Sequence, residues 1–338
     1  MMTLNRRKAL TLMGGAAAAS ALATPALSKN KKITVGALRF TSHSGSFIAL
    51  EKGLFAEAGL DVELKFFQAS QPMAVAIASG DVDYAVTAIS GGLISLADKG
   101  AIKVIGGALS EEEGIDGQKI LASDAAFQAG LTSPAMLDGK TYGMTTAGSS
   151  FHYMGSKVAA AEGVNVKFKP LQKVGAIIGA LKSGQIDAWS IVPHIAKPLA
   201  GSGKVHIIGS VSDYVPNYQV TTVFTSAKNA ANERGMTSDF LKGFSGGVAE
   251  YNAAMVDKTQ GDEAMQATVD LIHKYVYADR PREKAAKSII NGSMRLNAGA
   301  ALNVASVEDQ LNWFKSEGLV GADITLDTLV DASYVKTM

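Results

Sequence analysis

A weak internal duplication at a constant separation of 104 positions constrains the fold of this chain more than any other feature. Residues 76–83 have the sequence AIASGDVD, and residues 180–187 have the sequence ALKSGQID. At the same separation, residues 59–62 (GLDV) match residues 163–166 (GVNV). Two separate stretches that match without relative slip indicate two copies of one structural unit.

Each copy has the pattern strand–helix–strand–helix–strand. In the first copy we predict strands at 33–38, 61–67 and 82–87, with helices at 46–52 and 72–78. In the second copy we predict strands at 141–145, 164–168 and 186–191, with helices at 150–161 and 174–182. Strands that alternate with helices favour an α/β fold of two lobes, each a mostly parallel sheet with helices on both faces.

The order of these elements also predicts where a ligand binds. In open α/β sheets, ligands lie outside the carboxyl ends of the strands. The loops at these ends are 39–45, 68–71 and 87–92 in the first copy and 145–152, 172–175 and 190–194 in the second. We expect the two sets of loops to face each other across a cleft.

Two short extended stretches, 118–123 and 218–224, join the copies and predict a two-segment hinge, because paired crossovers permit hinge closure around a ligand. Lobe one is expected to comprise 29–117 and 225–338, and lobe two to comprise 118–224 with both crossovers. We predict that the tail is helical and packs back onto lobe one, over 238–277, 282–293 and 307–317.

Residues 1–28 have the features of a signal peptide. The basic cluster Arg6-Arg7-Lys8 precedes an apolar run rich in small residues, and cleavage is expected after Ser28 or after Ala23. Residues 5–10 resemble the twin-arginine signal, which exports folded proteins; the alternative is an ordinary secretory signal that contains two arginines. The mature protein is therefore expected in the periplasm.

The composition excludes several classes of protein. The chain contains no cysteine, which rules out disulfides, thiolate nucleophiles and an N-terminal lipid anchor. It has 32 basic and 31 acidic residues; because residues 1–28 contain three of the basic ones and no acidic one, the mature chain has 29 against 31. This balance does not favour nucleic-acid binding. A length of about 310 residues suits two domains. We expect a soluble monomer without stable membrane insertion.

Three segments carry a family resemblance. The stretches 51–64 (EKGLFAEAGLDVEL), 78–86 (ASGDVDYAV) and 138–143 (DGKTYG) resemble the nitrate, sulfonate and thiamine-precursor family of ABC solute-binding proteins. The similarity covers about 33–225 and extends more loosely to the C-terminus. It implies the two-lobed, type II periplasmic binding protein fold. It also implies a substrate-binding component that delivers a small molecule to an ABC permease and its ATPase, with no cofactor.

Two alternatives to transport stay open at this stage. A sensory protein that presents its ligand to a receptor has the same sequence features. Some relatives resembling this scaffold are enzymes, but they depend on active cysteines or iron-binding motifs, and this chain has no cysteine. Fold alone does not decide between these functions.

The strongest candidate for ligand contact is Gly148-Ser149-Ser150-Phe151-His152. It follows a predicted strand and begins a helix, so free backbone N–H groups point into the cleft and favour an oxyanion such as a carboxylate, sulfonate or phosphate. The alternative is that Ser149 only caps its helix. In lobe one, the third loop contains Thr87 and Ser90 followed by two glycines.

Histidines, one arginine and several aromatic residues add further candidates. His43, His152 and His194 fall in three of the cleft loops, but their spacing matches no zinc motif, so no metal site is expected. Arg39 could pair with an acid group or form a surface contact instead. The complete predicted ligand-binding set is Arg39, Phe40, Thr41, His43, Ser70, Gln71, Thr87, Ser90, Thr146, Gly148, Ser149, Ser150, Phe151, His152, Trp189, His194 and Tyr214.

Phe40, Trp189 and Tyr214 are the expected aromatic walls of this pocket, because ligand sites are mostly apolar with a few placed polar groups. The mixture favours a small organic acid or sulfonate, with an aromatic or other planar body as one form of it. No catalytic residues are predicted.

Overall fold

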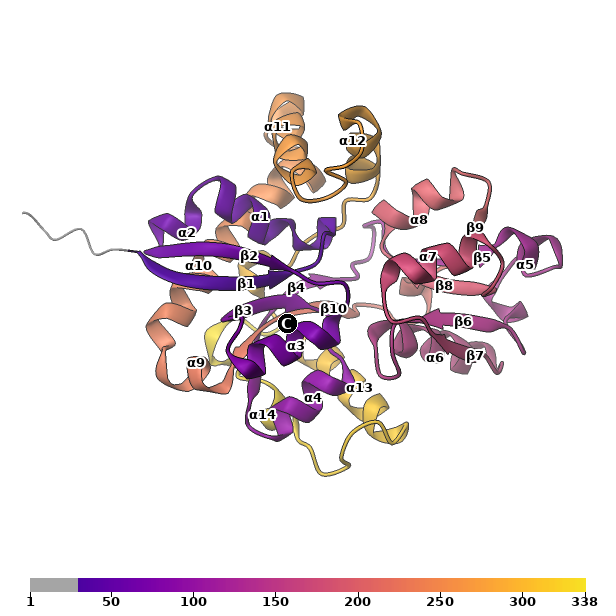
Figure 1. Ribbon diagram of the computed structural model, residues 1–338, viewed down its shortest axis with the longest axis horizontal. Coiled ribbons are helices and arrows are strands. Elements are labelled where there is room, and N and C mark those ends of the chain that lie inside the picture. Colours follow the sequence, from indigo (N-terminus) through magenta and orange to yellow (C-terminus); the bar gives the residue numbers. More distant parts are fainter. Residues whose placement is uncertain (1–29) are drawn as a thin grey trace, which may run out of the picture. The chain divides into compact units, whose positions relative to one another are not determined.

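The structure is a computed structural model that describes residues 30–338 (Figure 1). The predicted signal peptide and its cleavage sites lie outside the described residues. The described chain contains two sheets of five strands each, flanked by helices. The α/β prediction is therefore confirmed.

The first sheet has the strand order β2-β1-β3-β10-β4. Strands β1, β2 and β3 are parallel, whereas β10 runs antiparallel to both β3 and β4. The bounds of these strands are β1 (Lys31–Ala37), β2 (Leu60–Phe66), β3 (Tyr84–Thr87), β4 (Ile102–Ser110) and β10 (Gln219–Ser226).

The second sheet has the corresponding order β7-β6-β8-β5-β9. Its parallel strands are β6, β7 and β8, and β5 runs antiparallel to β8 and β9. The bounds are β5 (Lys119–Ser123), β6 (Thr141–Met144), β7 (Lys167–Pro170), β8 (Ala188–Ile191) and β9 (Val205–Ser210). Strand for strand, the second sheet repeats the first, and the fourth position in each is taken by a crossover strand.

The repeat extends to individual hydrogen bonds. The Asp83 carboxylate accepts a hydrogen bond from the Thr34 N–H at 2.8 Å, and its counterpart Asp187 accepts one from the Thr141 N–H at 2.7 Å. Each aspartate N–H in turn donates to the carbonyl of the same threonine. The two aspartates are 104 positions apart, so the sequence repeat corresponds to a structural one.

Helices cover both faces of the sheets. In the first half, α1 and α2 lie on one face and α3 and α4 on the other (Figure 1). The bounds are α1 (Ser44–Glu51), α2 (Leu54–Glu57), α3 (Ser70–Ser79) and α4 (Gly91–Asp98), with the short 3₁₀ helix η1 (Thr41–His43) before α1. The second half contains α5 (Asp124–Gln128), α6 (Ser150–Glu162), α7 (Val174–Lys182) and α8 (Pro193–Ala200).

The predicted helical tail is present, but it contacts both halves. Phe240 of α10 stacks on Tyr84 and Phe55, with ring centroids 4.2 and 5.5 Å away, which attaches the tail to the first sheet. By contrast, α12 packs against α8 of the second half. The bounds are α9 (Ala227–Asn232), α10 (Arg234–Tyr251), α11 (Gly261–His273), α12 (Arg282–Asn291), α13 (Val304–Ser316) and α14 (Leu326–Leu329). Within 30–338, no helix combines the length and apolar character needed to cross a membrane.

A candidate ligand site between the two lobes

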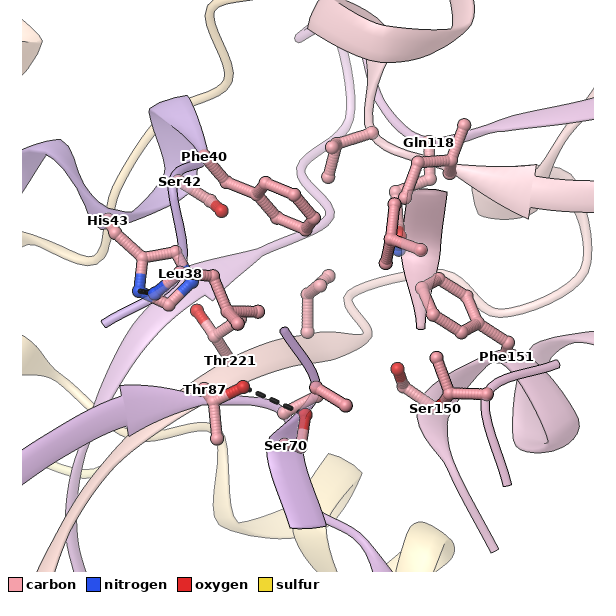
Figure 2. Close-up of a pocket in the computed structure, with 17 residues that line it drawn as sticks. Leu38, Phe40, Ser42, His43, Ser70, Thr87, Gln118, Ser150, Phe151 and Thr221 are labelled. Atoms are coloured by element: carbon pink, nitrogen blue, oxygen red, sulfur yellow. Dashed lines mark hydrogen bonds between the residues drawn. The ribbon is translucent and has the colours of Figure 1, made fainter. Parts of the chain in front are cut away.

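A cavity lies where the carboxyl ends of the parallel strands of both sheets meet (Figure 2). Its empty volume is about 510 Å³, which includes open solvent at the mouth. It is lined by Leu38, Phe40, Ser42, His43, Ala69, Ser70, Thr87, Ala88, Gln118, Thr145, Ser150, Phe151, Val174, Ile191, Val192, Val220 and Thr221.

Lobe one supplies a polar group at each of its three strand-to-helix turns. Ser42 and His43 follow β1, Ser70 is the first residue of α3, and Thr87 ends β3. The hydroxyls of Ser70 and Thr87 form a hydrogen bond of 2.8 Å on the cavity wall (Figure 2). In such a pair only one hydroxyl proton is used, so the pair can still bond a ligand.

Three residues that line the cavity have a buried polar atom without a hydrogen-bond partner within the described chain. The atoms are Nε2 of His43, Nε2 of Gln118 and Oγ1 of Thr221, whose residues are 0%, 2% and 6% exposed. Buried polar groups are normally paired, and leaving one unpaired costs about 1–3 kcal/mol. A ligand with hydrogen-bond acceptors would offer partners to these donors.

His43 presents a donor rather than a positive charge. The Leu38 N–H can only donate, and it lies 3.4 Å from Nδ1 of His43, which is therefore the acceptor nitrogen. Burial lowers the pKa of His43 to about 3, so the ring is neutral and its proton is on Nε2. This is the unpaired nitrogen.

Three helices begin at the cavity without a side-chain cap. Ser70, Ser150 and Val174 are the first residues of α3, α6 and α7, and all three line the cavity. None of these helices has a capping side-chain hydrogen bond, whereas Ser90 caps α4 by accepting from the Leu93 N–H. The free N–H groups and dipoles therefore favour negative charge in the cavity.

Apolar side chains form the rest of the wall. The rings of Phe40 and Phe151 approach the cavity from opposite lobes (Figure 2). Phe151 rests on Trp189, with ring centroids 5.3 Å apart. Among the described residues that line the cavity, none is Lys, Arg, Asp or Glu. The site thus combines helix termini and neutral donors with apolar walls.

The two lobes touch around the cavity. Oγ1 of Thr41 lies 2.9 Å from Nδ1 of His194, and the Gly91 N–H donates to the Gly148 carbonyl at 2.9 Å. At another part of the interface between the lobes, Nζ of Lys157 lies 3.0 Å from a carboxylate oxygen of Asp309. These contacts correspond to a closed arrangement of the lobes.

Six of the predicted site residues line the cavity, and others lie directly behind it. The six are Phe40, His43, Ser70, Thr87, Ser150 and Phe151. Thr41 and His194 form one of the inter-lobe contacts. Gly148 takes part in the second inter-lobe contact, and Trp189 supports Phe151. The buried hydroxyl of Ser149, the N-cap residue of α6, has no hydrogen-bond partner among the described residues.

The remaining predicted residues are elsewhere. The Arg39 guanidinium lies 3.9 Å from the Phe66 ring centroid and donates to the Tyr275 carbonyl, beside the cavity. The Tyr214 hydroxyl donates to Glu162. Gln71, Ser90, Thr146 and His152 do not line the cavity; Gln71 packs against Gly92, and His152 accepts a hydrogen bond from the Gly148 N–H.

Sequence reasoning missed two kinds of lining residue. Gln118, directly before β5, and Val220 and Thr221 of β10 also line the cavity. Nothing in the linear sequence pattern marks these residues as close to the ends of the parallel strands. The other missed residues are mostly small or apolar and are of the same types as core positions. The two exceptions, Ser42 and Thr145, have hydroxyl groups and lie in predicted cleft loops. The complete set is Leu38, Ser42, Ala69, Ala88, Thr145, Val174, Ile191 and Val192. Within 30–338, no three His, Cys, Asp or Glu side chains gather closely enough to hold a metal ion.

Two lobes built from repeated α/β units, with a cavity at their facing strand ends, define a protein of the periplasmic binding fold. The family model for NMT1/THI5-like proteins matches residues 40–254, more than half of the chain, so the chain belongs to this family. A comparison with curated proteins gives no match.

Solved structures confirm the fold. The alkanesulfonate-binding protein SsuA from Xanthomonas axonopodis pv. citri, bound to MOPS, has a TM-score of 0.70 and 14% identity over 89% of this chain and 98% of its own. The aliphatic sulphonate-binding SsuA from Escherichia coli has 0.69 and 16%, covering 91% and 94%. The nitrate-binding NrtA from Synechocystis PCC 6803 has 0.67 and 14%, covering 88% and 84%.

Proposed function

We propose that this protein is the periplasmic substrate-binding component of an ABC importer, which captures a small organic molecule by closing two lobes around it. The cavity between equivalent strand ends of the two lobes carries the proposal, because a ligand there touches both lobes and favours their closure. Family membership and the binding proteins among the structural neighbours support it. The partners would be a membrane permease and its ATPase.

The ligand that fits best is a small organic acid with an apolar body, either a carboxylate or a sulfonate. Three uncapped helix N-termini and neutral donors suit its acid group, and Phe40 and Phe151 suit an aromatic or other planar body. The absence of an acidic residue from the described cavity lining is consistent with an anion. A cation would find no counter-charge there.

The decisive experiment recovers the natural ligand. Protein purified from its native host is denatured, and the released compound is identified by mass spectrometry and tested for rebinding by calorimetry. Deletion of the gene should abolish uptake of that compound. Recovery of a chemically altered product after incubation would indicate an enzyme, and unimpaired uptake in the deletion strain would contradict the transport role.

A panel of probes tests the ligand class separately. Benzoate, benzenesulfonate and propanesulfonate are compared with benzylamine and butylamine for thermal stabilisation of the protein, because any ligand of the folded state raises its stability. Stabilisation by the acids is expected. Stabilisation by the amines alone would contradict an acid-binding cavity.

Export to the periplasm as a free, soluble monomer is part of the proposal, and the N-terminal sequence supports it. Replacement of both arginines (Arg6→Lys with Arg7→Lys) should retain the protein in the cytoplasm if the twin-arginine route is used. Fractionation and immunoblotting would show this, and unchanged export would indicate the general secretory route.

A further inference from the structure

Two buried histidines, one from each lobe, lie close together at the interface between the lobes. His43 ends η1 in lobe one, and His194 is the second residue of α8 in lobe two. Their exposed fractions are 0% and 1%. The Phe40 ring packs edge-on against both, with centroids 6.1 Å from His43 and 5.5 Å from His194. His194 thus contacts lobe one through Thr41 and Phe40, and His43 packs against the same Phe40 ring.

The hydrogen bonds around the pair favour neutral rings. Nδ1 of His43 faces the Leu38 N–H, so a proton added to Nδ1 would bring two donors together. Nδ1 of His194 is bonded to the Thr41 hydroxyl across the lobe interface. Nε2 of each ring is buried without a partner among the described residues, so a protonated ring would carry a buried charge that no hydrogen-bond acceptor at Nε2 offsets.

No carboxylate of the described chain offsets this cost. Burial lowers the pKa of both rings to about 3; for His194 the nearby His43 and Arg280 contribute in the same direction. Arg280 stacks on the ring of Tyr277, and the Tyr277 hydroxyl donates to the His194 carbonyl. The titratable and charged groups that face the pair are thus Tyr277, Arg280 and the two histidines themselves.

We propose that the ligand-free lobes close only when His43 and His194 are both neutral, so that acidification opens the protein. This inference concerns the regulation of the proposed ligand site and rests on the proposed function only for its biological meaning. The opening itself is a property of the two lobes and can be measured without any ligand.

The direction follows from proton linkage. When the lobes part, both rings meet water and regain a pKa of about 6.5. The closed form binds fewer protons, so closure is fully favourable above about pH 6.5 and weakens as the pH falls below it. Each histidine lowers the closing constant about tenfold per pH unit, and both together lower it up to about 100-fold per unit.

The absence of native cysteine allows closure to be measured directly. Cysteines introduced by Val75→Cys on α3 and Met136→Cys in lobe two, at side chains 54% and 50% exposed, are spin-labelled. The distance distribution is measured by pulsed electron resonance from pH 8 to pH 4.5. We expect a closed population at pH 8 that is lost on acidification, with a steepness approaching two protons.

Two variants remove the titration while keeping the Nδ1 contacts. In His43→Asn and His194→Asn, an amide atom replaces Nδ1 and carries no ionisable group. Each single variant should lower the steepness by about one proton, and the double variant should stay closed at pH 4.5. His206→Asn is the matched control, because His206 pairs with Asp124 in lobe two and does not line the cavity; it should behave like the wild type.

The half-buried His152 is tested in the same way. Burial lowers its pKa, but Glu317 opposes the shift, and its ring contacts Trp313 at another edge of the interface. We expect His152→Asn to change the pH profile less than either single variant.

Several results would overturn the inference. A wild-type distance distribution that is unchanged between pH 8 and pH 4.5 would do so, as would acid-induced opening that is identical in the double variant. Circular dichroism at each pH identifies unfolding; if the double variant fails to fold, the two single variants decide. A failed ligand search together with pH-dependent closure would contradict only the proposed function.

Discussion

The two lobes share a fold but not the chemistry of their ligand-facing turns. At the constant separation of 104 positions, Ser70 of lobe one corresponds to Val174 of lobe two, and Thr87 corresponds to Ile191. Each of these residues occupies the same place in its lobe, at the start of a helix or the end of a strand. The polar pair of lobe one is thus replaced by an apolar pair in lobe two.

This difference assigns separate tasks to the lobes. Lobe one carries polar groups on all three turns, whereas lobe two carries them only on the first, at Thr145 and Ser150. A ligand would therefore place most of its hydrogen bonds on lobe one, and its apolar body would be covered when lobe two closes. The two lobes therefore share a repeated fold but differ in the side chains at equivalent positions.

The largest expected effect comes from the aromatic wall of lobe two. Phe151→Ala should lower the free energy of unfolding by about 3–5 kcal/mol, because the buried ring packs on Trp189 and its removal leaves a cavity. Phe40→Ala in lobe one should cost less, because Phe40 is only half-buried. Urea denaturation measures both. Equal losses of unfolding free energy in the two variants would contradict this expected difference between the lobes.

A second experiment removes the polar pair of lobe one. Ser70→Ala with Thr87→Val makes the turns of lobe one as apolar as those of lobe two. The compound recovered from the native protein should bind about 100-fold more weakly, since two hydrogen bonds worth about 1.5 kcal/mol each are lost. Calorimetry measures the affinity. Val174→Ala in lobe two is the matched control, and an equally large loss there would contradict the division of tasks.

The repeat made much of the fold predictable. The SGDVD and SGQID segments mark equivalent helix ends, where Gly80 and Gly184 have positive φ angles of 82° and 72°. The aspartates that follow hold the first strand of each unit, so the spacing preserved a set of hydrogen bonds. The alternation of strands and helices then indicated which loops lie at the carboxyl ends of the strands.

The site was less predictable, for two physical reasons. Apolar wall residues such as Ile191 and Val192 are of the same residue types as core positions, so the sequence does not reveal that they face a cavity. Thr221 lies on the antiparallel strand β10, about 130 positions from Thr87, and only the tertiary pairing brings them together. Arg39 and Tyr214 were suggested by residue type, but local partners hold both side chains outside the cavity lining.

The paired aspartates provide a smaller comparison. The Asp187 carboxylate accepts hydrogen bonds from both the N–H and the hydroxyl of Thr141, each at 2.7 Å. The Asp83 carboxylate accepts the equivalent backbone bond from the Thr34 N–H. Asp187→Ala should therefore destabilise the protein more than Asp83→Ala, by about 1–2 kcal/mol. Thermal and urea unfolding measure the difference. Thr141→Val, which removes only the hydroxyl, should reproduce it.

The smallest effect is expected at the exposed edge of the lobe interface. Lys157 and Asp309 form an ion pair between side chains that are 30% and 47% exposed, and such pairs contribute less than about 1 kcal/mol. Lys157→Met should thus change the closing constant by no more than about fivefold, and added salt should erase the difference by screening. Thr41→Val removes the buried contact to His194 and should open the labelled protein further. If Lys157→Met opened it more than Thr41→Val did, closure would depend on surface charge rather than on the buried histidine edge.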